Sequence, residues 1–218
     1  MSIPLFPLSI VQFPGVLTPL HIFEQRYREM LRDVMAGTRI FGILLISDSP
    51  SGEPMAGDIG CTVEVVSAQE LEDGRSNILC IGRDRFRVVE VKTGRPYFCG
   101  EVEYFDDDPT QDFSAEKQKK ASDLFLRIVK AGNEIRRAAG QDTSIPPELP
   151  ADPEALSFLI AASLEADLEA KQRWLEMTST QRRLSILTNL LTEIVETYEL
   201  RAQVSRIPRR PNSDTRST

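Results

Sequence analysis

The chain has 218 residues, of which 41% are hydrophobic and 27% are charged, and its formal net charge is −7. This composition is that of a globular protein with one large or two small hydrophobic cores, and no apolar stretch approaches the roughly 18–20 residues of a membrane-spanning helix. The acidic balance argues against nucleic acid as the main partner, because such proteins need Lys and Arg to neutralise phosphates.

The N-terminal residues and the cysteines indicate a reducing compartment. Met1 to Pro4 contain neither a basic patch nor a small-residue cleavage site, so no signal peptide is predicted and a cytoplasmic location is expected. The three cysteines, Cys61, Cys80 and Cys99, lie in β-like runs and form no CxxC pair. We expect them to be small buried residues, with no disulfide and no zinc site.

The first half of the chain predicts short strands with one helix inserted early. Apolar runs at 5–11 and 16–20 are separated by the turn signal Pro14-Gly15. From Phe23 to Ala36, apolar residues recur every three or four positions, which predicts an amphipathic helix that Gly37 closes. The dense apolar run 40–46 then favours a strand that is buried on both faces.

Further strands are predicted up to residue 105. The Pro-, Gly- and Ser-rich stretch 47–57 predicts a loop, and the runs 59–68 and 76–82 are joined by the hairpin signal at Asp73-Gly74. The apolar pattern continues at 86–91, and alternation returns at 97–105. Together these runs indicate a compact antiparallel barrel or half-barrel.

A domain boundary is predicted at Asp106 to Thr110, where three acidic residues precede a proline and favour extended, solvated chain. The expected division is a β-subdomain at 1–107, a helical subdomain at 112–206 and a mobile tail at 207–218. The β-subdomain carries 10 Lys and Arg against 16 Asp and Glu. The basic cluster Arg206, Arg209 and Arg210 reaches into the tail, so it is a weak indication of a binding surface.

Helix signals dominate the second half. Ser114, Asp152 and Asp167 are predicted N-caps, and either Ser179 or Thr180 caps the last helix. In that helix apolar residues repeat with 3-4 spacing, which is typical of a heptad seam. Two readings stay open: the seam packs inside its own helical bundle, or it forms a coiled coil with a second copy. The seam residues are Leu184, Leu187, Leu191, Ile194 and Tyr198.

No motif for catalysis or cofactor binding is present. None of the twelve glycines is followed by Lys, which excludes a P-loop, and neither Gly-x-Gly-x-x-Gly nor Gly-x-Ser-x-Gly occurs. Nucleophilic catalysis through histidine would depend on His21, the one histidine, for which a structural role is favoured. Glu101 and Glu103 fit a solvated strand edge. We therefore predict no enzyme activity, no catalytic residue, no cofactor and no metal.

Several segments together resemble the N-terminal, substrate-binding domain family of Lon proteases. The most specific is the opening motif, which combines Leu5-Phe6-Pro7-Leu8, Phe13-Pro14-Gly15 and Pro19-Leu20-His21-Ile22-Phe23-Glu24-x-Arg26-Tyr27. Weaker matches follow at Gly57-Asp58-Ile59-Gly60, Asp73-Gly74-Arg75, residues 82–87, Lys171-Gln172, Leu175-Glu176 and Arg183-Leu184.

The resemblance implies an α+β fold: an N-terminal PUA-like antiparallel β pseudo-barrel with one inserted helix, followed by a C-terminal α-helical bundle. In full-length Lon this region precedes an ATPase and a Ser-Lys protease and helps to recognise unfolded or tagged proteins. Neither later domain is in this sequence. The resemblance therefore implies a stand-alone, non-catalytic protein- or peptide-binding module, serving as an adaptor or regulator in protein quality control or proteolysis.

Phe6, Phe13, Phe23 and Tyr27 are the candidate peptide-binding residues. We expect them to line a groove between the barrel and the inserted helix, although they could equally fill the core. Glu24 and Arg26 belong to the same motif and are assigned a structural role.

The expected partners are unfolded or tagged protein segments, and a separate protease or a second copy of the chain is a further candidate. RNA binding is the alternative function, because PUA-like barrels often hold RNA, but the acidic charge speaks against it.

Overall fold

A computed structural model describes residues 2–46, 52–109, 114–144 and 148–206. The chain divides into two compact units, each made of two segments. Unit 1 contains residues 1–111 and 150–183, and unit 2 contains residues 112–149 and 184–218. The segments 47–51 and 207–218, predicted as part of a loop and as a mobile tail, lie outside the described residues.

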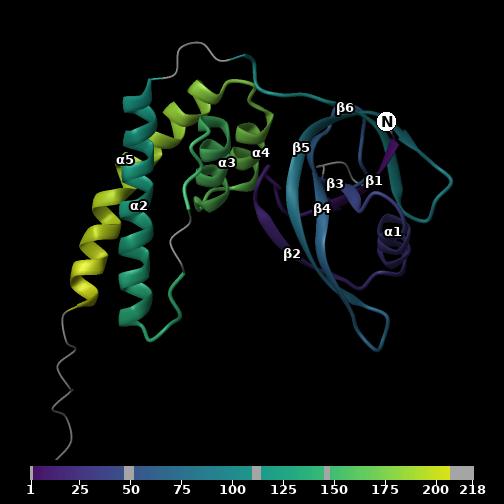
Figure 1. Cartoon of the computed structure of the whole chain (residues 1–218), viewed down its shortest axis with the longest axis horizontal. Helices are drawn as coiled ribbons and strands as arrows, with labels where there is room; N and C mark the ends of the chain where they lie inside the picture. The colour runs from purple at the N-terminus through teal and green to yellow at the C-terminus, as the bar shows by residue number, and fades with distance from the viewer. Residues whose placement is uncertain (1, 47–51, 110–113, 145–147, 207–218) are drawn as a thin grey trace, which may run out of the picture. The chain divides into compact units, whose positions relative to one another are not determined.

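Unit 1 is built on six strands and one early helix within the described residues. The elements are β1 (Ser2–Leu8), β2 (Leu17–Ile22), α1 (Gln25–Ala36), β3 (Ile40–Leu45), β4 (Ile59–Glu70), β5 (Ser76–Lys92) and β6 (Phe98–Tyr104). Figure 1 shows the strands curving around a common interior, with α1 against one side of them. The predicted helix and strands are all present, and Phe23 lies just before α1 rather than on its apolar face.

Five of the six strands pair in a closed ring. The sheet order is β2-β5-β4-β3-β1-β6, and an additional pairing between β5 and β6 closes it. The length of β5 makes this closure feasible, because its first half pairs with β2 and its second half pairs with β6. The expectation of a purely antiparallel barrel was wrong in one place: β1 pairs with β3 in parallel, with Leu5 opposite Gly42. The helix between β2 and β3 lets β3 start from the same end as β1.

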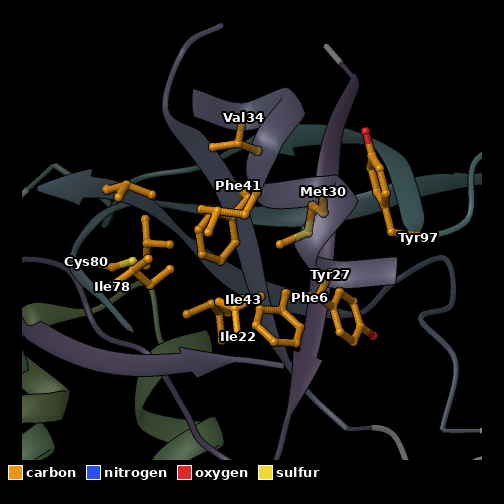
Figure 2. Close-up of a cluster of buried hydrophobic side chains, with 13 residues drawn as sticks. Phe6, Ile22, Tyr27, Met30, Val34, Phe41, Ile43, Ile78, Cys80 and Tyr97 are labelled. Carbon is orange, nitrogen blue, oxygen red and sulfur yellow. The ribbon is translucent and has the colours of Figure 1, made fainter. Parts of the chain in front are cut away.

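Unit 1 has two hydrophobic clusters, which lie on opposite faces of β1 and β3, because Leu5 and Leu44 belong to one and their neighbours Phe6 and Ile43 to the other. The larger joins α1 to the strands, and Figure 2 shows Phe6, Tyr27, Met30 and Phe41 converging within it. The smaller surrounds Phe86, which is fully buried with Leu5 and Leu44. Both clusters draw on alternate residues of the strands, as a half-buried sheet requires. Burial of these side chains is the main stabilising term of unit 1.

Helices α3 (Pro153–Ser163) and α4 (Leu168–Glu176) also belong to unit 1. The predicted caps are confirmed: the carboxylates of Asp152 and Asp167 accept hydrogen bonds from the backbone N–H groups of Ala155 and Ala170 at 2.8 and 2.6 Å. Each cap satisfies a backbone donor that the helix itself leaves unpaired. The expected division had placed these helices with the helical subdomain, whereas their contacts group them with the strands.

Unit 2 consists of α2 (Ala115–Ala138) and most of α5 (Thr180–Ser205). The two helices lie side by side, and the guanidinium of Arg127 on α2 contacts the carboxylate of Glu199 on α5 at 2.8 Å. Leu184, Leu187 and Leu191 of the predicted seam are buried, together with Val195. The caps predicted at Ser114 and Ser179 are present, since their hydroxyls accept hydrogen bonds from Lys117 N and Arg182 N.

Candidate functional site

The outward face of β2 carries an unusual row of exposed side chains, Leu17, Pro19, His21 and Phe23, which we call the β2 outer row. Leu17 is 55% exposed and Phe23 is 59% exposed, although both are large and apolar. Residues two apart in a strand point to the same face, and the stacked rings of His21 and Phe23 extend the row one residue past the strand. Exposed apolar residues that gather in one place mark interaction surfaces.

Neighbouring strands widen this apolar face. Ile81 of β5 lies opposite Leu17, and Leu79 lies opposite Pro19, so their side chains share the same face of the sheet and are half-buried. Val66, at an irregularity in the β4–β5 pairing, is 52% exposed. His21 is held in place by a hydrogen bond of 2.7 Å between its Nδ1 and Asn77 Oδ1. The β2 outer row is therefore the rim of an apolar face that crosses three strands.

The second edge of β2 is open. Within the described residues β2 pairs with β5 alone, so one side of its backbone has no strand partner. Gly82 N donates to Val16 O, so even-numbered residues face β5 and Pro19 faces the open edge. Proline there removes one backbone donor, which limits indiscriminate edge-to-edge pairing. On that edge the backbone N–H and C=O groups of Leu17 and His21 pair with no other strand of the described residues, which leaves them available to an extended chain.

The four candidate aromatic residues do not lie together. Phe6, Phe13 and Tyr27 are 6%, 1% and 3% exposed, whereas Phe23 is 59% exposed. Phe6 and Tyr27 pack ring against ring, as Figure 2 shows, and their ring centroids are 4.1 Å apart. The ring of Phe13 packs against that of Phe158 on α3, with the two ring centroids 6.0 Å apart. These three residues therefore join elements of unit 1, as the core-filling alternative describes, and of the four only Phe23 is exposed.

Glu24 and Arg26 lie at the start of α1. The guanidinium of Arg26 is 3.0 Å from the Glu24 carboxylate, and it also covers the rings of Tyr27 and Phe98 at 4.6 and 5.6 Å. Phe98 belongs to β6, so Arg26 connects the helix to the strands. Both charged side chains are about half exposed, so their ion pair contributes little stability by itself.

Sequence reasoning missed a buried charge cluster made of Arg85, Asp107 and Arg183. The Asp107 carboxylate is 2.5 Å from the Arg85 guanidinium and 2.6 Å from that of Arg183. The side chains of Arg85, Asp107 and Arg183 are 2%, 4% and 0% exposed. The expectation that the stretch around Asp107 is solvated chain was wrong at this residue. The acidic residues beside it, Asp106 and Asp108, are exposed as expected.

Further polar groups complete this cluster. Arg85 donates to the carbonyls of Leu175 and Met177, and Arg183 donates to the Ser157 hydroxyl at 2.7 Å. Burial alone would raise the pKa of Asp107, but hydrogen bonds from Arg183 and Thr180 and the two guanidinium charges lower it below its usual value. The cluster ties β5, α3 and the chain after α4 together, which is a structural role.

Other groups with possible chemistry among the described residues are metal-binding side chains, cysteines and lysines. The described residues contain no group of three or more His, Cys, Asp or Glu side chains placed to hold a metal ion. Burial raises the pKa of Cys61 and of Cys80 to about 12, so both thiols stay protonated and unreactive at neutral pH. Lys92 pairs with Glu101, and burial lowers the pKa of Lys171, which donates to the carbonyl of Ala162.

Among the described helices, none is both long and apolar enough to span a bilayer.

Comparison with known proteins decides the family. The family model described as the ATP-dependent protease La (LON) substrate-binding domain matches residues 2–193. The chain belongs to this family. Lon proteases of Cytophaga hutchinsonii and Syntrophus aciditrophicus are 24% and 26% identical to it over 216 and 212 residues, which is 93% of the chain in each case. The chain spans about a quarter of the length of these relatives, 25% and 26%.

Solved structures of Lon N-terminal domains share the fold. A Lon N-terminal domain protein from Xanthomonas campestris is 26% identical with a TM-score of 0.63, and the match covers 87% of this chain and 98% of that one. The N-terminal domain of a Mycobacterium avium complex Lon protease has a TM-score of 0.61 at 15% identity, with coverages of 88% and 99%. The mixed α/β architecture is therefore that of a Lon N-terminal domain.

The Lon family match includes both features described above. It extends over the β2 outer row and over all three members of the buried charge cluster. Only the buried cluster has an evident structural purpose, because its charges are satisfied within unit 1. The side chains of the β2 outer row, by contrast, are exposed in unit 1.

Proposed function

We propose that this chain is a non-catalytic polypeptide-binding module in which the β2 outer row receives extended, apolar segments of client proteins. Membership of the Lon substrate-binding family supports substrate recognition, and the exposure of Leu17 and Phe23 beside an open strand edge is the observation that carries the site. An added strand would pair with the backbone of β2 while its alternate side chains cover the row. Unfolded or tagged segments offer such strands.

In this proposal the closed strand ring is a PUA-like pseudo-barrel, and the helices after residue 112 form its helical bundle. The module acts as an adaptor or regulator in protein quality control or proteolysis. A separate protease, or a second copy of the chain that docks through α5, is the further partner. The charge of residues 1–107 supports protein clients over the RNA alternative, because 16 acidic residues oppose 10 basic ones.

Replacing Leu17 and Phe23 together with Ser is expected to weaken binding of a permanently unfolded, reduced and carboxymethylated polypeptide by roughly tenfold. Covering two large apolar side chains is worth at least about 1.4 kcal/mol, which is a tenfold change in affinity. Fluorescence anisotropy of the labelled polypeptide measures this. Both side chains are already exposed, so the thermal stability of the variant should stay unchanged.

The matched control replaces Val89 and Tyr104 with Ser, because these apolar side chains are 53% and 41% exposed on other strands. The control variant should bind like the unaltered chain. Equal affinities for the two double variants would show that the β2 outer row is not the binding surface. Competition by a single-stranded RNA of the same length tests the alternative function in the same assay.

A further inference from the structure

Unit 1 also has a hollow that shares no lining residue with the β2 outer row. Its volume is about 800 Å³, within the range of roughly 300–1,000 Å³ that is usual for ligand sites. The end of β3, the turn before β4 with the first residue of that strand, and one side of α4 with its N-cap line it. Its apolar part consists of Leu45, Ile46, Ile59 and Leu168. Ile46 is 42% exposed and Leu168 is 38% exposed, so the hollow offers uncovered apolar surface.

The rim of this hollow is acidic. Asp58, Asp167, Glu169 and Glu176 line it against a single guanidinium, that of Arg173. Asp58 Oδ2, Asp167 Oδ1 and Glu176 Oε1 accept hydrogen bonds from within the fold, at 2.8, 2.6 and 2.9 Å. Within the described part of the chain the second oxygen of each of these three carboxylates has no partner. The Arg173 guanidinium lies 3.7 Å from the fourth carboxylate, that of Glu169, so the rim keeps a net negative charge together with free acceptors.

The spacing of the carboxylates indicates an extended cation rather than a metal ion. Three or more of them would have to converge to hold a metal, and no such group occurs among the described residues. The carboxylates instead come from two elements, the turn before β4 and α4. A Lys or Arg side chain, with several donors at the end of an apolar stem, fits charges that are distributed around an apolar floor.

Gln172 of α4 also lines the hollow. Its Nε2 donates to Ile59 O at 3.0 Å and to Glu176 Oε1 at 2.9 Å, which fixes the orientation of the amide. Its Oε1 is buried and has no hydrogen-bond partner. Because this oxygen is enclosed by protein atoms, a ligand in the hollow meets only the apolar floor and the acidic rim.

We propose that this hollow, the α4 pocket, binds a Lys- or Arg-containing apolar segment of a polypeptide and gives the module a preference for basic clients. The inference rests on the proposed function, because it names the kind of polypeptide that is recognised. The apolar floor takes the hydrophobic side chains, and the acidic rim takes the cation. Its surface is separate from the β2 outer row, so the two sites are testable one at a time.

The test uses three labelled peptides of equal length and the same apolar residues, in which the remaining positions are Lys, Ser or Glu. The Lys peptide is expected to bind most tightly and the Glu peptide most weakly. Glu169→Lys should weaken binding of the Lys peptide by roughly 3- to 10-fold, since it replaces an attraction at an exposed carboxylate with repulsion. Leu168→Ser should weaken the Lys and Ser peptides alike, and added salt should reduce the preference for Lys.

Two matched controls lie in unit 2. Glu193→Lys makes the same charge change at an exposed position of α5. Leu126→Ser makes the same apolar-to-polar change on α2, where the Leu126 side chain is as exposed as that of Leu168, at 38%. Both controls should leave peptide binding unchanged, and the melting temperatures of all four variants should agree. Equal binding of the three peptides, or no effect of Glu169→Lys and Leu168→Ser, would overturn the α4 pocket. The proposed function would still stand in that case if the unfolded polypeptide binds to the chain. Failure of every peptide and of the unfolded polypeptide to bind would overturn both.

Discussion

Replacement of Asp107 with Ala is expected to lower the free energy of unfolding by about 3–5 kcal/mol, because it leaves two buried guanidinium groups without a counter-charge. The side chains of Arg85 and Arg183 are only 2% and 0% exposed, so water cannot take over the role of the carboxylate. Trp174, the single tryptophan, is buried in α4 of unit 1 and reports this unfolding by its fluorescence during urea titration.

Asp106→Ala is the matched control, because that carboxylate is exposed one residue away. It should change stability by no more than about 0.5 kcal/mol. A comparable loss in both variants would mean that the acidic stretch acts through its overall charge, and the buried cluster would then have no special role.

The difference in free energy of unfolding between the unaltered chain and Asp107→Ala should shrink as the pH is lowered. The pKa of Asp107 is lowered in the folded state, so its stabilising contribution is fully present above the unfolded value of about 3.9. The contribution is lost as the pH falls through the folded pKa, when the carboxylate takes up a proton. Urea titrations should therefore give a constant difference between about pH 5 and 8 and a shrinking one below about pH 4.

Phe86→Ala is expected to cost about 3–5 kcal/mol, because it opens a cavity in the smaller cluster of unit 1. Phe86 is 0% exposed, and its ring fills the space that two glycines leave. A Cβ atom added at Gly42 would lie 2.5 Å from the Phe86 Cζ atom, and one added at Gly60 would lie 2.8 Å from it. Urea titration followed by Trp174 fluorescence measures the loss, with exposed Phe23→Ala as a control that should cost little.

The fit between Phe86 and Gly42 gives this prediction a second test. Gly42→Ala alone should destabilise by about 1–3 kcal/mol through overpacking. The same change in a Phe86→Leu background should cost less, because the shorter side chain leaves room for the new methyl group. Additive effects in this double-mutant cycle would show that the ring and the glycine do not constrain one another.

Local patterns predicted the elements of this fold well, because capping and periodicity act over a few residues. The heptad spacing of Leu184, Leu187 and Leu191 and the caps at Asp152 and Asp167 needed no knowledge of distant residues. The parallel β1–β3 pairing was not predictable in this way, since strand direction depends on the route between strands rather than on either strand's composition.

The candidate site was predicted less well, for a physical reason. Apolar character alone does not distinguish Phe23, which is exposed, from Phe13, which is buried, because both lie in short apolar runs next to turns. Asp107 was indistinguishable from Asp106 and Asp108 in sequence. Its role depends on Arg85 and Arg183, which lie 22 and 76 residues away along the chain. Such pairs become visible only when the strands and helices have been placed.

The two segments of unit 1 are separated along the chain by part of unit 2, so the ribosome makes the strands of unit 1 well before its last residues. The strand ring is complete in sequence by Tyr104, but Arg85 and Asp107 meet Arg183 only after the whole of α2 has been made. Until then the nascent ring holds a charged cluster without its last member. Chains stalled with residue 110 just outside the ribosomal tunnel should therefore be digested by protease faster than chains stalled with residue 206 outside, and equal resistance would contradict this order.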